Sequence, residues 1–498
     1  MLYDALISLP LLETQRLLAL ALVVISIYVV QRRRQWNLRR GGRPLPPGPK
    51  GLPIIGNALD IPTKFEWEVY DKWAKEYDSE IVHAGALGFS IAVLSSRKAA
   101  IEILDHKSAV TSARFVPTHP TQSMGWDFIL PLIQIGDKYR DMRKLFQQHF
   151  HDATRYRVGV KESLPQMLSS LVDNPEDFRY INRFFIMSTV YKFTYGVRDK
   201  AKVDYYSKML QDVAERSAQA VIPGAFLVDI FPFLKYVPEW APGAGFKRVA
   251  RESFELGLRF ADEPLNEALN EMNLGNGETC FVSTAHSNAE RDGVVDEQSL
   301  RLIRDVGASV TTAGTDTILS TLDYFYYTMS VHPKVQQLAQ KELDDYLKGD
   351  RLPTLDDEPN LPYITALVRE VVRGKHIIPF LLAGVAHLST EDLVYNGYFI
   401  PRNTFIIPNQ WAMLRDENDF PQPEMFKPER HLTSEGKLNS SVVNPESIAF
   451  GFGRRICPGS HLAMSTLFVA ISSVLTLFTI EKVEEFDPDR QIRLGVSR

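Results

Sequence analysis

Cysteine is nearly missing from this sequence: only Cys280 and Cys457 occur among its 498 residues. Two cysteines cannot build a disulfide framework, and they cannot supply a multi-cysteine zinc or iron–sulfur site. If a metal site or a nucleophile depends on sulfur in this protein, it therefore depends on a single thiolate.

Other signatures are missing as well. The sequence has no His-Glu-x-x-His zinc motif, no Gly-x-Ser-x-Gly nucleophile elbow and no phosphate-binding Gly-Lys-Ser/Thr loop. The net charge is -5, and basic residues form no long stripe beyond the N-terminal region, which argues against nucleic-acid binding. No linker rich in Pro, Gly and Ser divides the chain, so its ample apolar content predicts one large catalytic unit.

A long apolar run is present only near the N-terminus, at residues 17–30. As a helix it would span roughly 21 Å at ~1.5 Å per residue, less than the ~30 Å hydrocarbon core of a bilayer. A cleaved signal peptide would have a run of this length. However, six arginines follow the run and no small-residue cleavage site is visible, which favours an uncleaved single-pass anchor with the rest of the chain in the cytoplasm. Snorkelling arginines can make up the missing length.

Prolines then dominate residues 44–53, where they favour a stiff, extended spacer. We therefore predict an anchor at 1–31, a basic and Pro-rich hinge at 32–53 and a catalytic domain at 54–498. Residues 221–240 are apolar but broken by three prolines. They fit either an ordinary packed connection or a lip that dips into the membrane beside the substrate access path.

The catalytic domain is predicted to be mainly α-helical with small β-sheets. Residues 81–86 and 91–94 predict one hairpin, and 393–395 with 398–400 predict a second around an Asn-Gly turn, with 405–408 as a candidate third strand. The longest helix should begin near Asp296 and end before Pro333, a length of roughly 55 Å. Residues 273–293 are polar and predict a surface loop.

The strongest motif surrounds Cys457. It reads Phe450, Gly451, Phe452, Gly453, Arg454, Arg455, Ile456, Cys457, Pro458 and Gly459. The glycines allow the backbone to approach a flat ligand closely, and Pro458 suits the first turn of the apolar helix that follows. A thiol at a helix N-terminus beside arginines should have its thiolate favoured by the helix dipole and by the charges.

A second motif lies in the middle of the long helix, where Ala313 and Gly314 precede Thr315, Asp316 and Thr317. Hydroxyls that bond back to the preceding turn, together with glycine, predict a local opening of the helix. An acid beside a hydroxyl can relay protons in a dry cavity. Taken alone, core-facing threonines explain this motif equally well.

A third motif pairs Glu370 with Arg373, which share one helix face at a spacing of three residues. Bidentate pairing leaves room for a second arginine, and Arg430 is the candidate. An isolated pair of this kind is more often a surface salt bridge.

Taken together, these motifs resemble those of the cytochrome P450 family, and the resemblance covers the chain from the Pro-rich hinge to the last helix. Trp126, Gly136, Asp137 and Trp411 resemble fungal microsomal members of secondary metabolism. The resemblance implies the cytochrome P450 fold, with a long central helix over a haem b. It also implies oxidation of a lipophilic substrate with O2, using electrons from NADPH through a membrane-bound reductase at the endoplasmic reticulum.

The same resemblance assigns roles to residues. Cys457 would be the axial ligand of the iron. Thr317 would hydrogen-bond iron-bound dioxygen, and Asp316 would help to deliver protons. Glu370, Arg373 and Arg430 would form a buried structural triad. The remaining haem contacts would be Arg455, Arg143, His387, Tyr139, Phe450 and Gly451. Tyr139 stands where the family has tryptophan, and its hydroxyl can still donate a hydrogen bond.

Two departures from the family motivate other hypotheses. Gly374, Lys375 and His376 replace the Trp and Pro that usually follow Arg373, and residues 377–386 are about three residues longer than in relatives. The chain ends at Arg498, where relatives continue into a C-terminal hairpin. A degenerate, non-catalytic haem protein is therefore an alternative, and a haem-thiolate isomerase or dehydratase is another, although Asp316 and Thr317 favour oxygen activation.

Overall fold

The protein is mainly helical. A computed structural model describes residues 11–114, 125–126, 128–150, 153–221, 228, 232–241, 244–374 and 385–482. Its α-helices are α2 (Leu11–Arg40), α3 (Glu66–Glu76), α4 (Arg97–Ala100), α5 (Ser108–Thr111), α6 (Asp137–Phe150), α7 (Ala153–Asp173), α8 (Phe178–Tyr195), α9 (Lys200–Val221), α11 (Gly245–Asn273), α12 (Phe281–Arg291), α13 (Glu297–Gly314), α14 (Asp316–Val331), α15 (Pro333–Leu347), α16 (Pro362–Gly374), α17 (Gln410–Met413), α18 (Glu446–Ala449) and α19 (Ser460–Leu477).

Short helices of other types connect these elements. They are the π-helix η1 (Ile101–His106) and the 3₁₀ turns η3 (Leu130–Leu132), η4 (Pro175–Asp177), η5 (Pro232–Tyr236), η6 (Leu355–Asn360), η8 (Pro428–His431) and η9 (Gly453–Arg455).

The strands form two small sheets. β1 (Ile81–Ala86), β2 (Phe89–Leu94), β6 (Thr404–Pro408) and β3 (His387–Leu388) make one sheet in the order β1-β2-β6-β3, and β4 (Leu393–Tyr395) pairs with β5 (Tyr398–Ile400) in the other. Both predicted hairpins are confirmed, and Asn396 and Gly397 have the positive φ angles that an Asn-Gly turn requires. The third candidate strand instead joins β2 in parallel register, because the chain crosses back from the second hairpin.

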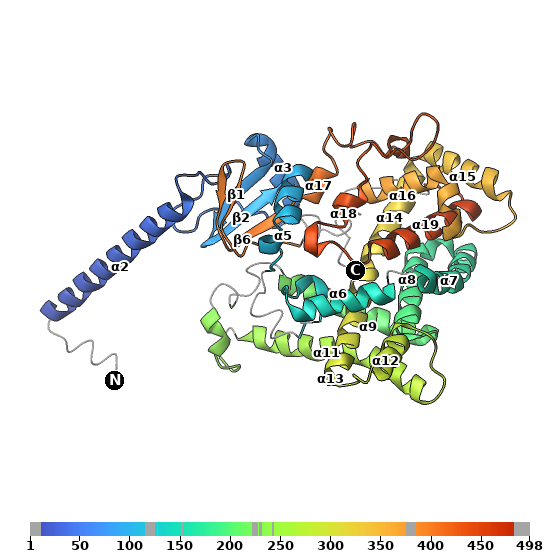
Figure 1. The fold of residues 1–498 in the computed structure, drawn as a ribbon, viewed down its shortest axis with the longest axis horizontal. Coiled ribbons are helices and arrows are strands. Elements are labelled where there is room, and N and C mark those ends of the chain that lie inside the picture. The colour runs from blue at the N-terminus through green and yellow to red at the C-terminus, as the bar shows by residue number, and fades with distance from the viewer. Residues whose placement is uncertain are drawn as a thin grey trace.

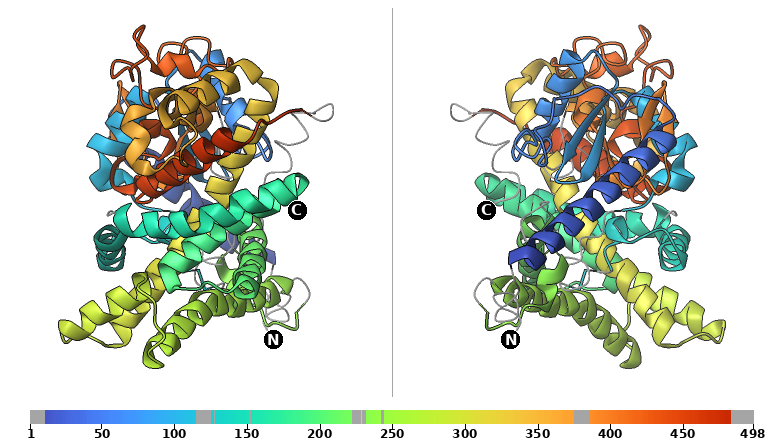
Figure 2. Two further views of the ribbon diagram at one scale, coloured as in Figure 1. Left: turned by 90° about the vertical axis from the view of Figure 1, so that its right-hand side faces the viewer. Right: turned by 90° about the vertical axis from the view of Figure 1, so that its left-hand side faces the viewer.

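The elements gather at two ends of the molecule, and the central helix, which consists of α13 followed by α14, runs between them (Figures 1 and 2). The sheets and the C-terminal elements lie at one end, and α9, α11 and α12 lie at the other. The apolar helix α19 packs against α7, α14, α15 and α16 at the centre of the largest hydrophobic cluster.

The long helix begins as predicted, because the Asp296 side chain accepts a hydrogen bond from the backbone of Ser299 in a capping box. It is divided at Thr315 into α13 and α14. Thr311, Thr312 and Thr317 each donate a hydroxyl hydrogen bond to the carbonyl four residues earlier. The predicted local opening of this helix is thus found, with the competing hydroxyls that weaken the backbone ladder.

The N-terminal helix α2 continues to Arg40, beyond residue 31 where the predicted anchor ends, so the basic residues up to Arg40 are helical. Its last turns contact the second sheet: Trp36 packs edge-on to Phe399 at 5.7 Å between ring centroids, and Arg39 forms an ion pair with Asp392. Among the described residues, only α19 is long and apolar enough to cross a membrane by composition, and more than half of it is buried.

The prediction of a loop at 273–293 was wrong. Cys280 caps a helix there, α12, in a box with Ser283. Phe281, Val282 and Ala285 bury one face of α12 against the core, so an apolar stripe outweighs the polar composition.

The predictions for 221–240 fall partly outside the described residues; within the described part, Phe233, Tyr236 and Trp240 are exposed. Most of the altered segment after Gly374 and the last residues, 483–498, also lie outside them.

Candidate haem-thiolate site

The Cys457 loop, residues 450–459, is held in a sharp turn before α19. The Cys457 N–H donates to the carbonyl oxygen of Phe450 at 2.8 Å, and Gly451 has a φ of 81°. Gly453 has a positive φ and packs directly on η1, where a Cβ atom would overlap the carbonyl oxygen of Leu104. Only glycine fits here, because any side chain would displace the loop from η1.

The thiol of Cys457 is solvent-accessible and yet closely surrounded by protein, and this burial raises its pKa above the ordinary value. The Gly459 N–H and the charge of Arg143 act in the opposite direction with smaller effects. We expected a lowered pKa from Arg454 and Arg455. The structure differs because desolvation outweighs the helix terminus, and because Arg143 is the cation that acts on the sulfur.

Helix α6 braces the Cys457 loop from one side. Tyr139 donates its hydroxyl to the carbonyl oxygen of Arg454 at 2.7 Å, and Arg143 donates to that of Ile456 at 2.6 Å. The Arg455 guanidinium lies over the Tyr139 ring at 4.4 Å. Tyr139 and Arg143 therefore contact the loop itself, through carbonyls that flank Arg455 and precede Cys457.

Three basic side chains gather beside this loop, and we call them the Arg455 cluster: Arg114, His387 and Arg455. Arg455 donates Nε–H to the Ser112 carbonyl at 2.8 Å, and His387 contacts the Thr111 carbonyl at 2.9 Å. Arg114 donates to the Pro131 carbonyl at 3.1 Å and is nearly fully buried.

The Arg455 cluster has no anion among the described residues. Both Nη atoms of Arg455 are buried there without a hydrogen-bond acceptor. Burial and the neighbouring charge of Arg455 lower the pKa of Arg114 to about 9, and burial with Arg114 nearby lowers that of His387 well below its ordinary value. Two buried arginines without a carboxylate partner, beside a histidine that burial keeps neutral, form a site that an anionic ligand would complete.

The break between α13 and α14 carries the second predicted group. Thr317 Oγ1 donates to the Ala313 carbonyl at 2.8 Å, and Ala313 is exposed although the helix runs through the protein. Asp316 lies 3.2 Å from Arg183 of α8 in an ion pair. Burial nevertheless raises the pKa of Asp316, outweighing the opposite effect of Arg183. This carboxyl group can therefore take up a proton more readily than an exposed aspartate can.

The third motif forms a closed, largely buried assembly, which we call the Glu370 cluster: Glu370, Arg373, Arg430 and His431. Glu370 accepts from Arg373 at 2.8 and 2.9 Å, from Arg430 at 3.1 Å and from His431 at 3.0 Å. These partners lower the pKa of Glu370 to about 2 despite its burial. The two arginines also donate to backbone carbonyls of residues 414–425, which fixes the chain that leads to the Cys457 loop.

Comparison with known proteins agrees with this geometry. The family model described as Cytochrome P450 matches residues 46–497, which is nearly the whole chain. The chain belongs to the cytochrome P450 family. It is 38% identical to Cytochrome P450 monooxygenase ple1 of Rhodocybe pseudopiperita over 95% of this chain and 91% of that protein. It is 37% identical to Cytochrome P450 monooxygenase COX2 of Coprinopsis cinerea, covering 89% and 84% of the two chains.

A third similar protein is Tryptamine 4-monooxygenase of Psilocybe cyanescens, which is 34% identical over 92% of this chain and 89% of that protein. The family model and these similar proteins identify the present chain as an oxidoreductase that incorporates oxygen into its substrate.

The residues present fit the haem that the family implies. An accessible thiol stands next to a cationic cluster whose unpartnered Arg455 nitrogens suit haem propionates. Two members of these assemblies were not predicted from the sequence. Arg114 lies in no motif, so a single sequence carries no signal for it. His431 directly follows Arg430, and that position beside the motif was the signal available.

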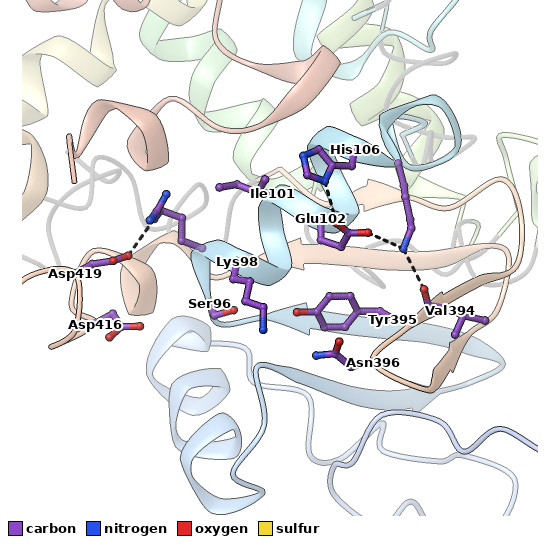
Figure 3. Close-up of a pocket in the computed structure, with 12 residues that line it drawn as sticks. Ser96, Lys98, Ile101, Glu102, His106, Val394, Tyr395, Asn396, Asp416 and Asp419 are labelled. Atoms are coloured by element: carbon purple, nitrogen blue, oxygen red, sulfur yellow. Dashed lines mark hydrogen bonds and ion pairs between the residues drawn. The ribbon is translucent and has the colours of Figure 1, made fainter. Parts of the chain in front are cut away.

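A hollow of 710 Å³ among the described residues lies elsewhere on the surface of this cytochrome P450 (Figure 3). Its charges neutralise each other in pairs, such as Arg97 with Asp419 at 3.1 Å and Lys107 with Glu102 at 3.2 Å. None of the predicted site residues lines it. It therefore gives no ground for a ligand of its own.

Proposed function

We propose that this chain is a membrane-anchored cytochrome P450 that binds haem b through Cys457 and oxidises a lipophilic substrate in fungal secondary metabolism. Electrons would come from NADPH through a membrane-bound reductase at the endoplasmic reticulum. The observation that carries the proposal is the Arg455 cluster, because buried cations without an anion beside an accessible thiol match the two carboxylates and the iron of a haem.

A haem held by a thiolate supplies activation of dioxygen and cleavage of the O–O bond. The protein's own part is to hold this group and to manage protons. Arg455, Arg114 and His387 would hold the propionates. Arg143 and Tyr139 keep the carbonyls of the loop in place, and the Gly459 N–H is directed at the sulfur.

Proton supply would be the task of Asp316 and Thr317. The raised pKa of Asp316 lets its carboxyl hold a proton, and Arg183 restrains the side chain. The Thr317 hydroxyl donates to the Ala313 carbonyl, so its oxygen stays available to accept a hydrogen bond on the exposed side of the helix. Isomerase or dehydratase chemistry would need neither NADPH nor this proton supply.

The anchor would be α2. Its residues 17–30 are exposed and apolar, and arginines follow on the same helix. By the positive-inside tendency, the basic end and the catalytic domain would lie on the cytoplasmic side. Retention of the chain in membranes after an alkaline carbonate wash, and release of a Val23→Arg/Val24→Arg variant, would test the anchor.

The test of the haem site is the Soret difference spectrum of the reduced protein under carbon monoxide. Wild type should give the strongly red-shifted band of a thiolate ligand, and Cys457→Ala should lose it. Cys280→Ala is the matched control and should keep the band, because Cys280 caps α12 and does not belong to the loop. A wild-type spectrum typical of a neutral axial ligand would contradict the proposal.

The electron source is tested by product formation with a lipophilic substrate panel. Product should require NADPH and a reductase, and Asp316→Asn should slow turnover by about 10²-fold, the usual effect of removing a proton-transfer group. Product formed without NADPH would favour the isomerase or dehydratase alternative. One relative is named for action on tryptamine, so small aromatic amines belong in the panel.

A further inference from the structure

A fully buried carboxylate on α13 has no part in the chemistry described above. Asp305 has none of its surface exposed, and it lies three helical turns before Asp316. Burying an isolated carboxylate is costly unless cations and hydrogen bonds compensate for the lost water. Its position therefore calls for a specific reason.

Two cations form ion pairs with Asp305, one at each carboxylate oxygen. Lys138 Nζ, at the start of α6, lies 2.8 Å from Oδ2. Arg304 donates Nε–H and Nη2–H to Oδ1 at 2.9 and 2.8 Å, and its Nη1–H reaches Asp262 of α11 at 3.2 Å. Asp305 thus fastens the first turn of α6 to the central helix.

A second contact on the same face of α13 supports this fastening. Ser309, one turn after Asp305, donates its hydroxyl to the Phe128 carbonyl at 2.6 Å and accepts from the Leu130 N–H at 3.1 Å. Residues four apart share a helix face. The central helix therefore holds both the segment that leads into α6 and the beginning of α6 itself.

The position of α6 in turn determines the support of the Cys457 loop. Tyr139 directly follows Lys138, and Arg143 lies one turn further; these two side chains bond the carbonyls of Arg454 and Ile456. Phe146 of the same helix lies beside Gly459, whose N–H is directed at the sulfur. Any displacement of α6 along α13 would move these contacts together.

We propose that Asp305 is a positioning residue that acts through Lys138 and α6 to keep the Cys457 loop in its ligand-holding shape. This inference rests on the proposed haem-thiolate function. It connects the helix on the oxygen side of the site to the loop on the sulfur side through a buried ion pair. Asp305 itself contacts neither the Cys457 loop nor, by this proposal, the haem.

The test compares Asp305→Asn, Lys138→Met and the double variant with Asp323→Asn. Asp323 is the matched control, because its ion pair with Arg179 at 2.8 Å also joins a helix to the same central helix but does not involve α6. Each full-length protein is loaded with haem, reduced chemically under carbon monoxide and exposed to increasing urea. The Soret band reports the thiolate, and far-UV circular dichroism reports the helices.

We expect Asp305→Asn and Lys138→Met to lose the thiolate band at least about threefold faster than wild type at urea concentrations that leave the helices intact, a smaller effect than the 10–100-fold loss typical of groups that bond a ligand directly. The double variant should be no worse than the worse single variant, because both break one connection. Asp323→Asn should match wild type.

Equal behaviour of Asp305→Asn and Asp323→Asn, or additive effects of the two single changes, would overturn the proposal. Loss of the band only together with helix unfolding would also overturn it, because that would show a general structural role. If Asp305→Asn fails to fold, Lys138→Met alone decides the question, since Lys138 lies near the surface. A wild-type protein without the thiolate band would instead overturn the proposed function, and this inference with it.

Discussion

The Glu370 cluster and the Arg455 cluster both gather basic side chains in the interior of the protein, yet they differ in one respect. The first surrounds a carboxylate that the chain itself supplies, and every charge in it has a partner. The second has no carboxylate among the described residues, and two nitrogens of Arg455 lack acceptors. By our proposal, the first cluster supports the fold and the second binds an anionic ligand.

The largest effect should follow from breaking the completed cluster. Glu370→Gln removes the charge that compensates Arg373 and Arg430, and leaving buried cations unpaired costs about 3–5 kcal/mol. We expect little folded protein, and a loss of this size in the free energy of unfolding measured by urea and circular dichroism. Glu429→Gln is the neighbouring control and should cost under about 1.5 kcal/mol, since its amide oxygen can still accept from Tyr363 and only its charge, one of several near Arg430, is removed. Equal losses would contradict the distinction.

Acid should weaken the same cluster. The pKa of Glu370 is about 2 in the folded protein and 4.5 ordinarily, so its stabilising effect is complete above pH 4.5 and is lost as the pH falls towards 2. The difference corresponds to about 3 kcal/mol. Urea unfolding at a series of pH values should show this loss, and Arg430→Gln should show a smaller one because one cation is gone. If stability fell with acid as steeply in Arg430→Gln as in wild type, Glu370 would not be the source of the acid sensitivity.

Breaking the uncompleted cluster should affect the ligand and spare the fold. Arg455→Met should weaken haem binding by about 10-fold or more, the usual effect of losing a supporting group around a metal centre. The haem-free protein should be as stable as wild type or more so, because an unpaired buried cation is gone. Haem titration followed at the Soret band, with urea unfolding of the haem-free protein, measures both. Arg454→Met, at the exposed neighbouring position, is the control, and an equal loss there would refute the role of Arg455.

The smallest effect is expected for an ion pair at the surface. Arg39 and Asp392 are each about one-third exposed, so water already screens their attraction. A double-mutant cycle with Arg39→Ala and Asp392→Ala should give a coupling free energy of about 0.2–1 kcal/mol in urea unfolding. A coupling free energy as large as the loss expected for Glu370→Gln would mean that burial does not explain why the Glu370 cluster is stronger than the Arg39–Asp392 pair.

The sequence predicted the elements that local patterns determine. The Asn396-Gly397 turn, the Asp296 cap and the break near Thr315 each follow from side chains acting on their own backbone. It did not predict contacts between distant segments. Arg114 joins Arg455 across more than 300 residues, Lys138 meets Asp305 across α6 and α13, and the buried face of α12 depends on packing rather than composition. The pKa of Cys457 differed from expectation for the same reason, since burial is a tertiary property.

The continuity of α2 with its docked end has a mechanical consequence. Because the helix runs unbroken to Arg40 and Trp36 packs against Phe399, α2 and the second sheet would rotate together as one rigid unit. In a bilayer, the catalytic domain would then diffuse laterally in a preferred orientation relative to the membrane and would not rotate freely about a flexible linker. A reductase in the same membrane would encounter only some faces of the catalytic domain, so a larger share of encounters would have the orientation that electron transfer needs.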